Sequence, residues 1–139
     1  MPKVNRKQNN RSPQYFHYIN SRGWKQSLRR KIALNLLFGR DPIIPLLKAH
    51  DVEHLSYKRV DFQNCTGYEI PFIDLIPLNR FIHHQVITPL KGFLKGLLGR
   101  KLGNAIVAHF LRACLLFWYG VLLLALFLFA LLILYLMGF

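Results

Sequence analysis

The chain has 139 residues, of which 19 are Lys or Arg and 6 are Asp or Glu; its formal net charge is +13, and 53% of the residues are hydrophobic. This length supports one small core and excludes a multidomain enzyme, a long solenoid and a large barrel. Charge and apolar character are segregated, because Arg112 is the single charged residue after position 104. Composition therefore predicts a basic module followed by an apolar segment.

Two distant cysteines, Cys65 and Cys114, are present, and Cys114 lies within the apolar segment. They exclude a disulfide framework and a four-cysteine zinc site, so no structural zinc is expected. The N-terminal residues are basic and polar with no apolar stretch behind them, so no cleavable signal peptide is expected.

Residues 1–17 are predicted to form a flexible basic arm, because they include Arg11 and other cations but no acidic residue. Such an arm is either a solvated tail or a contact for nucleic acid or anionic lipid. Residues 21–37 have apolar side chains at helical spacing and basic side chains on the other faces. They predict an amphipathic helix with Ser21 as its N-cap, ended by Gly39 and the following prolines.

Residues 46–90 are divided into short segments by polar residues, glycine and proline. The pattern predicts a strand at 52–57, a loop at 61–67, a second extended segment at 68–73 and a helix at 78–86 that ends before Pro89. The soluble part is therefore expected to be a small α+β module at residues 18–90.

Residues 91–112 combine basic side chains with glycines at 92, 96, 99 and 103. The glycine spacing would allow close helix packing, but each glycine weakens a helix by about 1 kcal/mol. We therefore expect a flexible basic connector at a membrane surface, where it would meet anionic lipid, rather than a dimer motif.

Residues 113–137 carry no charge and are rich in Leu and Phe. As a helix of about 37 Å they exceed the bilayer hydrocarbon thickness of about 30 Å, which predicts one transmembrane helix; a buried core helix is the alternative. Aromatic residues of the interfacial type lie toward its ends: Trp118, Tyr119 and Tyr135. Basic residues precede this helix, so the positive-inside rule predicts a tail-anchored, single-pass protein with its N-terminal module in the cytoplasm.

Residues suited to metal binding and proton transfer occur in two segments of the module. Glu53 and His54 are adjacent in the first predicted strand, and Asp74 is followed by His83 and His84. A carboxylate and a histidine from different elements can bind one divalent ion, while a neighbouring free imidazole activates water. Each residue also has an ordinary structural interpretation, such as a surface carboxylate for Glu53 or a helix N-cap for Asp74.

The order of three segments resembles the HNH endonuclease family: YINSRGWKQSLRRK at 18–31, VEHLSYKRV at 52–60 and DLIPLNRFIH at 74–83. Bacterial and phage members often have a lead-in helix, then a segment like VHHLTY, a variable loop and DLIPLCxxCH. The resemblance implies a small ββα-metal (HNH-like) module with an N-terminal helix, here joined to one C-terminal transmembrane helix.

Carried over to this sequence, the resemblance implies that Glu53 and His83 bind one divalent ion, with Mg, Mn, Ni and Zn not distinguished. It assigns His54 as the general base and Asp74, in place of the family's Asn, as the residue that orients the base. In the family's chemistry the ion stabilises the phosphoryl charge and the 3′-oxygen leaving group.

The sequence departs from the family at the zinc knuckle. Asn79 and Ile82 stand at the positions of the family's second cysteine pair. The cysteine-free segment FGRDPIIPLL at 38–47 stands where the first pair is expected. We expect apolar packing to substitute for the zinc, by Phe38, Ile43, Ile44, Leu46 and Ile82. The loop at 58–73 is also longer than the family suggests.

The function expected from the sequence is metal-dependent cleavage of nucleic acid, with DNA favoured, by a membrane-anchored HNH-like endonuclease. Basic residues are the expected phosphate contacts: Arg11, Lys25, Arg29, Arg30, Lys31, Lys58, Arg59 and Arg80. One alternative is a catalytically inactive HNH-derived scaffold that binds nucleic acid or serves as an assembly subunit. Another is a membrane protein whose cations bind only anionic lipid.

Overall fold

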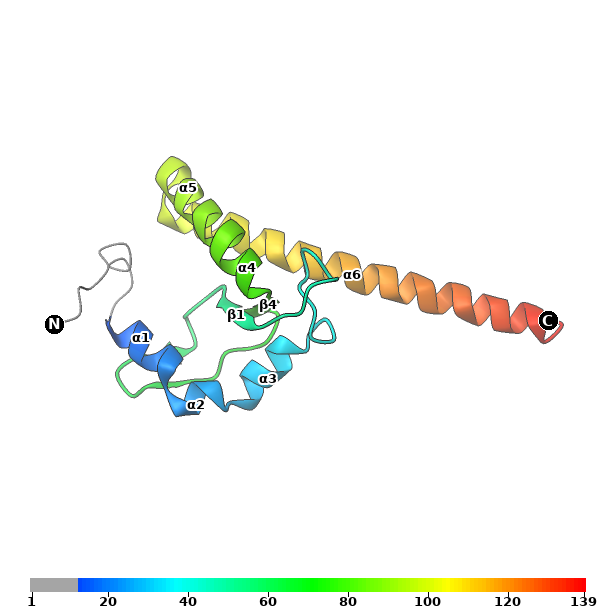
Figure 1. Ribbon diagram of the computed structural model, residues 1–139, viewed down its shortest axis with the longest axis horizontal. Helices are drawn as coiled ribbons and strands as arrows, with labels where there is room; N and C mark the ends of the chain where they lie inside the picture. The colour runs from blue at the N-terminus through cyan, green and yellow to red at the C-terminus, as the bar shows by residue number, and fades with distance from the viewer. Residues whose placement is uncertain (1–12) are drawn as a thin grey trace.

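The computed structural model describes residues 13–139, as a mixed α and β module from which one long C-terminal helix projects (Figure 1). Most of the predicted arm, including Arg11, lies outside the described residues. Its last part forms α1 (Pro13–Asn20), in which Tyr18 is fully buried. The folded module therefore begins within the segment that the sequence assigned to the arm.

The helix predicted at 21–37 is divided in two, α2 (Arg22–Lys25) and α3 (Leu28–Leu34). Ser21 caps α2 as predicted, because its side chain accepts a hydrogen bond from the Trp24 N–H. Ser27 is a second N-cap and accepts from the Arg30 N–H, which starts a new helix in a new direction. The three helices contribute to one buried cluster: Tyr18, Trp24, Ala33 and Leu75.

A two-stranded antiparallel hairpin forms the centre of the module. β1 (Asp51–His54) pairs with β4 (Leu75–Leu78), with Glu53 opposite Ile76 and His54 opposite Leu75. The second strand is not the predicted segment 68–73, because all four residues of β4 are buried whereas Phe72 has a left-handed backbone (φ 74°). Inside the connecting loop, β2 (Val60–Asp61) and β3 (Thr66–Gly67) form a smaller ribbon.

Helical structure follows the hairpin directly. Asn79 caps α4 (Arg80–Ile82), a π-helical turn, η2 (His83–Ile87), comes next, and α5 (Thr88–Leu98) continues from it. The helix does not end before Pro89 as predicted, since proline fits the first turn of α5, where its missing N–H costs little. The wide turn η2 carries both His83 and His84.

The predicted flexible connector is a helical hairpin instead. Gly99, with φ 87°, separates α5 from α6 (Arg100–Leu136), and the two helices pack against each other (Figure 1). A Cβ at Gly103 would lie 2.8 Å from the Lys95 backbone nitrogen, so the glycine permits the close approach. Gly103 thus acts in packing and Gly99 in the turn, whereas Gly92 and Gly96 leave open space and make no such close approach.

The first half of α6 completes the module's main core. Buried residues of α6 pack with residues of the hairpin and its following helices: Val107, Leu111, Leu115, Ile76, Leu78, Ile82 and Ile87. The division predicted at residue 112 therefore does not separate module from anchor. A soluble fragment has to retain α6 at least through Tyr119, which packs on the same core.

Beyond this contact α6 projects away from the module (Figure 1). It is long and apolar enough to cross a membrane, and none of its most apolar 18-residue window is buried. A buried core helix, the alternative that the sequence left open, therefore describes only the first turns of α6.

Residues 38–49, which include the segment expected from the resemblance to replace a zinc knuckle, are held by one buried carboxylate. Asp41 accepts hydrogen bonds from the Ile43 and Ile44 N–H groups at 2.7 and 2.8 Å, and from the Asn79 N–H at 2.7 Å. Asn79 in turn donates its side-chain amide to the Lys48 carbonyl. These bonds join the two positions that a zinc ion would link.

The apolar packing expected there is found only in part. Ile82 is buried in the core and Ile43 packs against it, whereas Phe38, Ile44 and Leu46 are exposed. Three of the five residues therefore do not substitute for the zinc, because the polar network of Asp41 already fixes the loop.

We predict that Asp41→Ala lowers the free energy of unfolding by about 3 kcal/mol, since it leaves three backbone N–H groups without their acceptor. Asp61→Ala is the matched control, because exposed Asp61 accepts from the Gln63 and Asn64 N–H groups in a similar turn. It should cost about 1 kcal/mol or less. Denaturant unfolding of the full chain in detergent measures both losses, and equal losses would contradict the role of Asp41.

Candidate active site

A pocket of about 670 Å³ opens between the N-terminal helices on one side and β1, η2 and α5 on the other. Its lining combines basic, aromatic and imidazole side chains: Lys25, Arg30, Lys91, Lys95, Tyr15, Phe16, Trp24, His54, His83 and His84. This composition suits a substrate that carries negative charge and planar groups.

Glu53 and His83 come together, as the motif predicts; His83 lines this pocket, whereas Glu53 is buried and is not among the lining residues. Glu53 Oε2 lies 2.7 Å from His83 Nε2, and Lys91 Nζ contacts the other carboxylate oxygen. The strand β1 presents the carboxylate, and the turn η2 places the imidazole over it. The two side chains meet although they are 30 positions apart.

Two cations stabilise the ionised form of Glu53. Burial opposes its ionisation, but the hydrogen bond from His83 and the charge of Lys91 outweigh this and lower the pKa of Glu53 to about 2. Burial also disfavours protonated His83, but its contacts with Glu53 and Asp51 outweigh this and raise the pKa of His83 above its ordinary value. Both shifts favour the ionic form of the pair.

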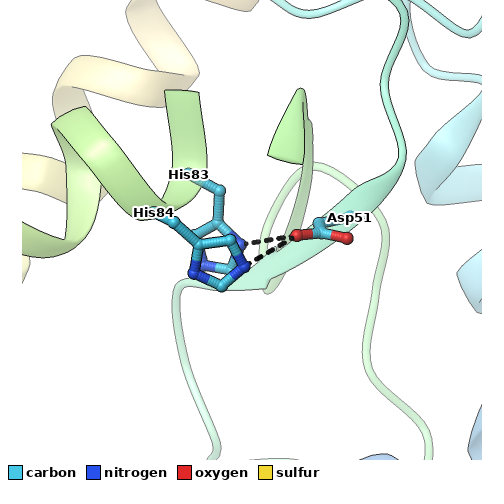
Figure 2. Close-up of side chains that lie close together, drawn as sticks. All are labelled: Asp51, His83 and His84. Carbon is cyan, nitrogen blue, oxygen red and sulfur yellow. Dashed lines mark hydrogen bonds and ion pairs between the residues drawn. The ribbon is translucent and has the colours of Figure 1, made fainter. Parts of the chain in front are cut away.

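Asp51 holds the opposite side of the His83 ring. Its Oδ2 lies 3.1 Å from His83 Nδ1 and 3.5 Å from His84 Nε2, and Figure 2 shows both imidazoles directed at this one carboxylate. The two rings stack at 4.7 Å. The sequence analysis missed Asp51, although strand alternation puts it on the same face of β1 as Glu53.

His54 is buried and enclosed by aromatic rings. Its imidazole lies 4.6 Å from the Trp24 ring and stacks on Tyr57 at 5.1 Å. Its Nε2 is 3.5 Å from Glu69 Oε1, and no hydrogen bond of normal geometry satisfies this nitrogen within residues 13–139. The ring is thus held in place by packing, with one nitrogen facing a carboxylate.

The residue beside His54 is Glu69 and not Asp74. Asp74 accepts from Arg59 Nη1 at 2.9 Å and from the Ile70 N–H at 2.9 Å, so it ties the long loop to the start of β4. The predicted role of Asp74 in orienting the base is therefore not supported by its position. The alternative prediction, that Asp74 is a helix N-cap, is also wrong, because Asp74 is followed by the strand β4.

Glu69 is fixed by Tyr18 and Arg29, both of which donate to its carboxylate. Burial opposes ionisation of Glu69, but His54, Tyr18 and Arg29 outweigh it and lower its pKa to about 2. Gly67 leaves the space for this cluster, since a Cβ there would lie 2.9 Å from the Glu69 carboxylate. The sequence offered no signal for Glu69, because it lies in the variable loop.

Only some of the residues predicted to contact phosphate line the pocket. Lys25 and Arg30 line the pocket, while Arg29, Arg59 and Arg80 contact Glu69, Asp74 and Asp51 respectively. Lys31 and Lys58 are exposed away from the pocket lining, and Arg11 is outside the described residues. Lys91 and Lys95, assigned by sequence to the connector, are pocket residues instead.

Comparison with known protein families, with characterised proteins and with solved structures gave no match to this chain. The resemblance to HNH endonucleases therefore depends on the order of its sequence segments alone.

Among the described residues, one group of three donors could hold a divalent ion: Asp51, His83 and His84 offer atoms within 4.8 Å of one another. Glu53 Oε2 and His83 Nε2 lie at hydrogen-bond distance from each other, and Lys91 contacts the other Glu53 oxygen, so an ion between Glu53 and His83 would have to displace these contacts. Carboxylate oxygen and imidazole nitrogen suit Mn, Ni, Zn and similar ions. With an ion held at His83 Nε2, Asp51 at Nδ1 would orient the ring.

The raised pKa of His83 gives a pH dependence that can be tested. The stabilisation from its contact with Glu53 is fully present below the ordinary pKa of 6.5 and is lost as the pH rises through the higher folded-state pKa. We predict that Glu53→Gln moves the His83 pKa down toward its ordinary value, measured by the NMR shifts of the imidazole protons. Asp61→Asn is the control, and an unchanged His83 pKa in Glu53→Gln would contradict the assignment.

Proposed function

We propose that this chain is a membrane-anchored, metal-dependent endonuclease of the HNH type. The observation that carries the proposal is the contact of Glu53 with His83, together with the presence of His83 and His54 in the lining of one basic pocket. The order of strand, strand and helix is the one that the family resemblance implies.

Each residue has a chemical role in the proposal. Glu53 and His83 would hold the divalent ion, and the chemistry that such an ion supplies is stabilisation of charge on the phosphoryl oxygens and the 3′-oxygen leaving group. His54 takes the proton of the attacking water at Nδ1, because Nε2 faces Glu69. Ionised Glu69 favours the tautomer with its proton on Nε2 and stabilises the imidazolium that forms.

The surroundings of the pocket support nucleic acid as the substrate. A second pocket shares His54, Lys91 and Lys95 with the first and extends to Arg100 on α6. Cations thus follow the surface on both sides of His54, as a phosphodiester backbone requires. Aromatic side chains, Tyr15 and Tyr57 among them, line the same pocket, and aromatic side chains are a common component of nucleic-acid binding sites.

The membrane part of the proposal depends on α6. In this proposal the uncovered part of α6, which is long and apolar enough to do so, spans the bilayer once, and the basic residues that precede it favour the cytoplasmic side for the module. The substrate would then be cleaved at the membrane surface.

A catalytically inactive nucleic-acid-binding scaffold is the second candidate, and one observation favours it. Lys91 Nζ contacts the Glu53 carboxylate, so an ammonium group already provides the positive charge that a metal ion would bring there. In an active enzyme Lys91 must move toward the substrate when the ion binds. In the scaffold it stays on Glu53.

Cleavage by the full chain in detergent separates the two candidates. We predict nicking of supercoiled plasmid in the presence of Mg²⁺, Mn²⁺ or Ni²⁺, and a loss of about 100-fold or more in His54→Ala, as removal of a general base requires. His109→Ala is the matched control, because His109 is exposed on α6 and lies outside both pocket linings and the candidate ligand group, so this variant should retain activity. Equal nicking by wild type and His54→Ala, or none by either, would contradict the nuclease proposal.

Phosphate contacts in the pocket predict a salt dependence of duplex binding. Each neutralised phosphate contributes about 0.9 to the slope of log affinity against log salt concentration, so Arg30→Gln should reduce the slope by about that amount. Lys31→Gln is the matched control, since Lys31 is adjacent on α3 but outside the pocket lining. Fluorescence anisotropy measures both, and equal slopes in the two variants would place the phosphates elsewhere.

A further inference from the structure

The loop that replaces the zinc knuckle touches α6 where this helix leaves the module. Trp118 Nε1 donates to the Pro42 carbonyl at 2.8 Å, and the Tyr119 hydroxyl donates to the Leu36 carbonyl. Figure 1 shows the segment after α3 beside the middle part of α6, at the end of the module from which the rest of α6 projects. The position of this loop along α6 is therefore fixed by two hydrogen bonds.

These contacts place the loop at the height of the membrane surface. The uncharged stretch begins at Ala113, directly after Arg112, and Trp118 and Tyr119 are of the type that lies at a bilayer interface. Residues 120–136 measure only about 25 Å as a helix, against a hydrocarbon core of about 30 Å. A spanning α6 therefore brings Trp118 and Tyr119, and the loop bound to them, to the edge of the hydrocarbon.

The loop presents apolar side chains that the protein leaves uncovered. Phe38 is 78% exposed and Leu46 is 88% exposed, and Ile44 between them is also exposed. Phe38 has a left-handed backbone (φ 54°), which costs energy in a residue with a Cβ and turns its ring outward. Two cations flank these side chains, Arg40 and Lys48, which are paired across the base of the loop.

We propose that residues 38–46 are a membrane-docking loop, whose apolar side chains enter the lipid interface beside α6 while Arg40 and Lys48 contact lipid phosphates. The inference rests on the proposed membrane span of α6. Its consequence is that the module has a defined orientation on the bilayer and does not rotate freely on a single helix. Apolar side chains with adjacent cations are what the interface of an anionic bilayer binds.

A second exposed apolar surface, on the α5 and α6 hairpin, provides the comparison. It includes Leu97, which is 65% exposed. Gly103, where α5 packs on α6, is about 24 Å along the helix axis from Tyr119, so this surface lies far from the hydrocarbon when α6 crosses the bilayer. The two surfaces therefore cannot both contact a membrane that α6 spans upright.

The test uses the full chain with Cys65→Ser and Cys114→Ser, carrying one cysteine labelled with an environment-sensitive NBD dye. The labelled positions are Phe38→Cys and Leu46→Cys, with Leu97→Cys as the matched apolar control and Leu126→Cys as the marker of the span. The protein is reconstituted into phosphatidylcholine and phosphatidylglycerol vesicles that contain nitroxide-labelled lipid. Unlabelled vesicles with aqueous iodide measure exposure to water.

We expect lipid-borne nitroxide to quench the dye at positions 38 and 46 roughly twofold more than at 97, at a shallower depth than at 126. Quenching at 126 without quenching at 38 and 46 would overturn the loop but leave the anchor intact. Lack of quenching at 126 would overturn the anchor itself and the loop with it. If the dye at positions 38 and 46 were protected from both the lipid nitroxide and aqueous iodide, a second copy of the chain would cover the loop, and lipid docking would be overturned.

Discussion

The packing of α6 on the β1 and β4 hairpin is the contact on which the rest of the structure depends. Val107, Leu111 and Leu115 close the core over the hairpin, and the same helix then continues without a break into its exposed apolar half. Because no flexible linker separates the two halves, the pocket, the docking loop and the proposed membrane span are parts of one rigid arrangement. Loss of this contact would expose the hairpin that carries Glu53 and His54.

Electrostatics follow from where the few acidic residues lie. Four of the six are buried, Asp41, Glu53, Glu69 and Asp74, and each accepts hydrogen bonds or ion pairs from neighbouring elements. They fix the loops and the two histidines from inside, while most of the cations remain at the surface. Lys91, Arg29 and Arg59 each pair with one of these carboxylates, which leaves the net positive charge of +13 on the other cations.

The sequence predicted the α+β class, the Ser21 cap, the strand that contains Glu53 and the meeting of Glu53 with His83, since these depend on local pattern and motif order. The predictions from the sequence were wrong where tertiary contacts determine the secondary structure. The second strand is β4 because the core buries Leu75–Leu78, and residues 91–112 are helical because Gly103 packs against α5. Asp74 was assigned by alignment to the family's Asn, whereas the long loop brings Glu69 to His54 from a distance that no local pattern reports.

We propose that Glu53 and His83 form a divalent-metal site in competition with Lys91. Titration of Mn²⁺ into the full chain in detergent, followed by electron paramagnetic resonance, tests this proposal directly. We expect one site per chain, tighter binding in Lys91→Met because Glu53 loses its competing cation, and no specific binding in His83→Ala. Lys101→Met, a change at an exposed position of α6, should bind as the wild type does. Equal affinity in Lys91→Met and the wild type, or undiminished binding in His83→Ala, would contradict the claim.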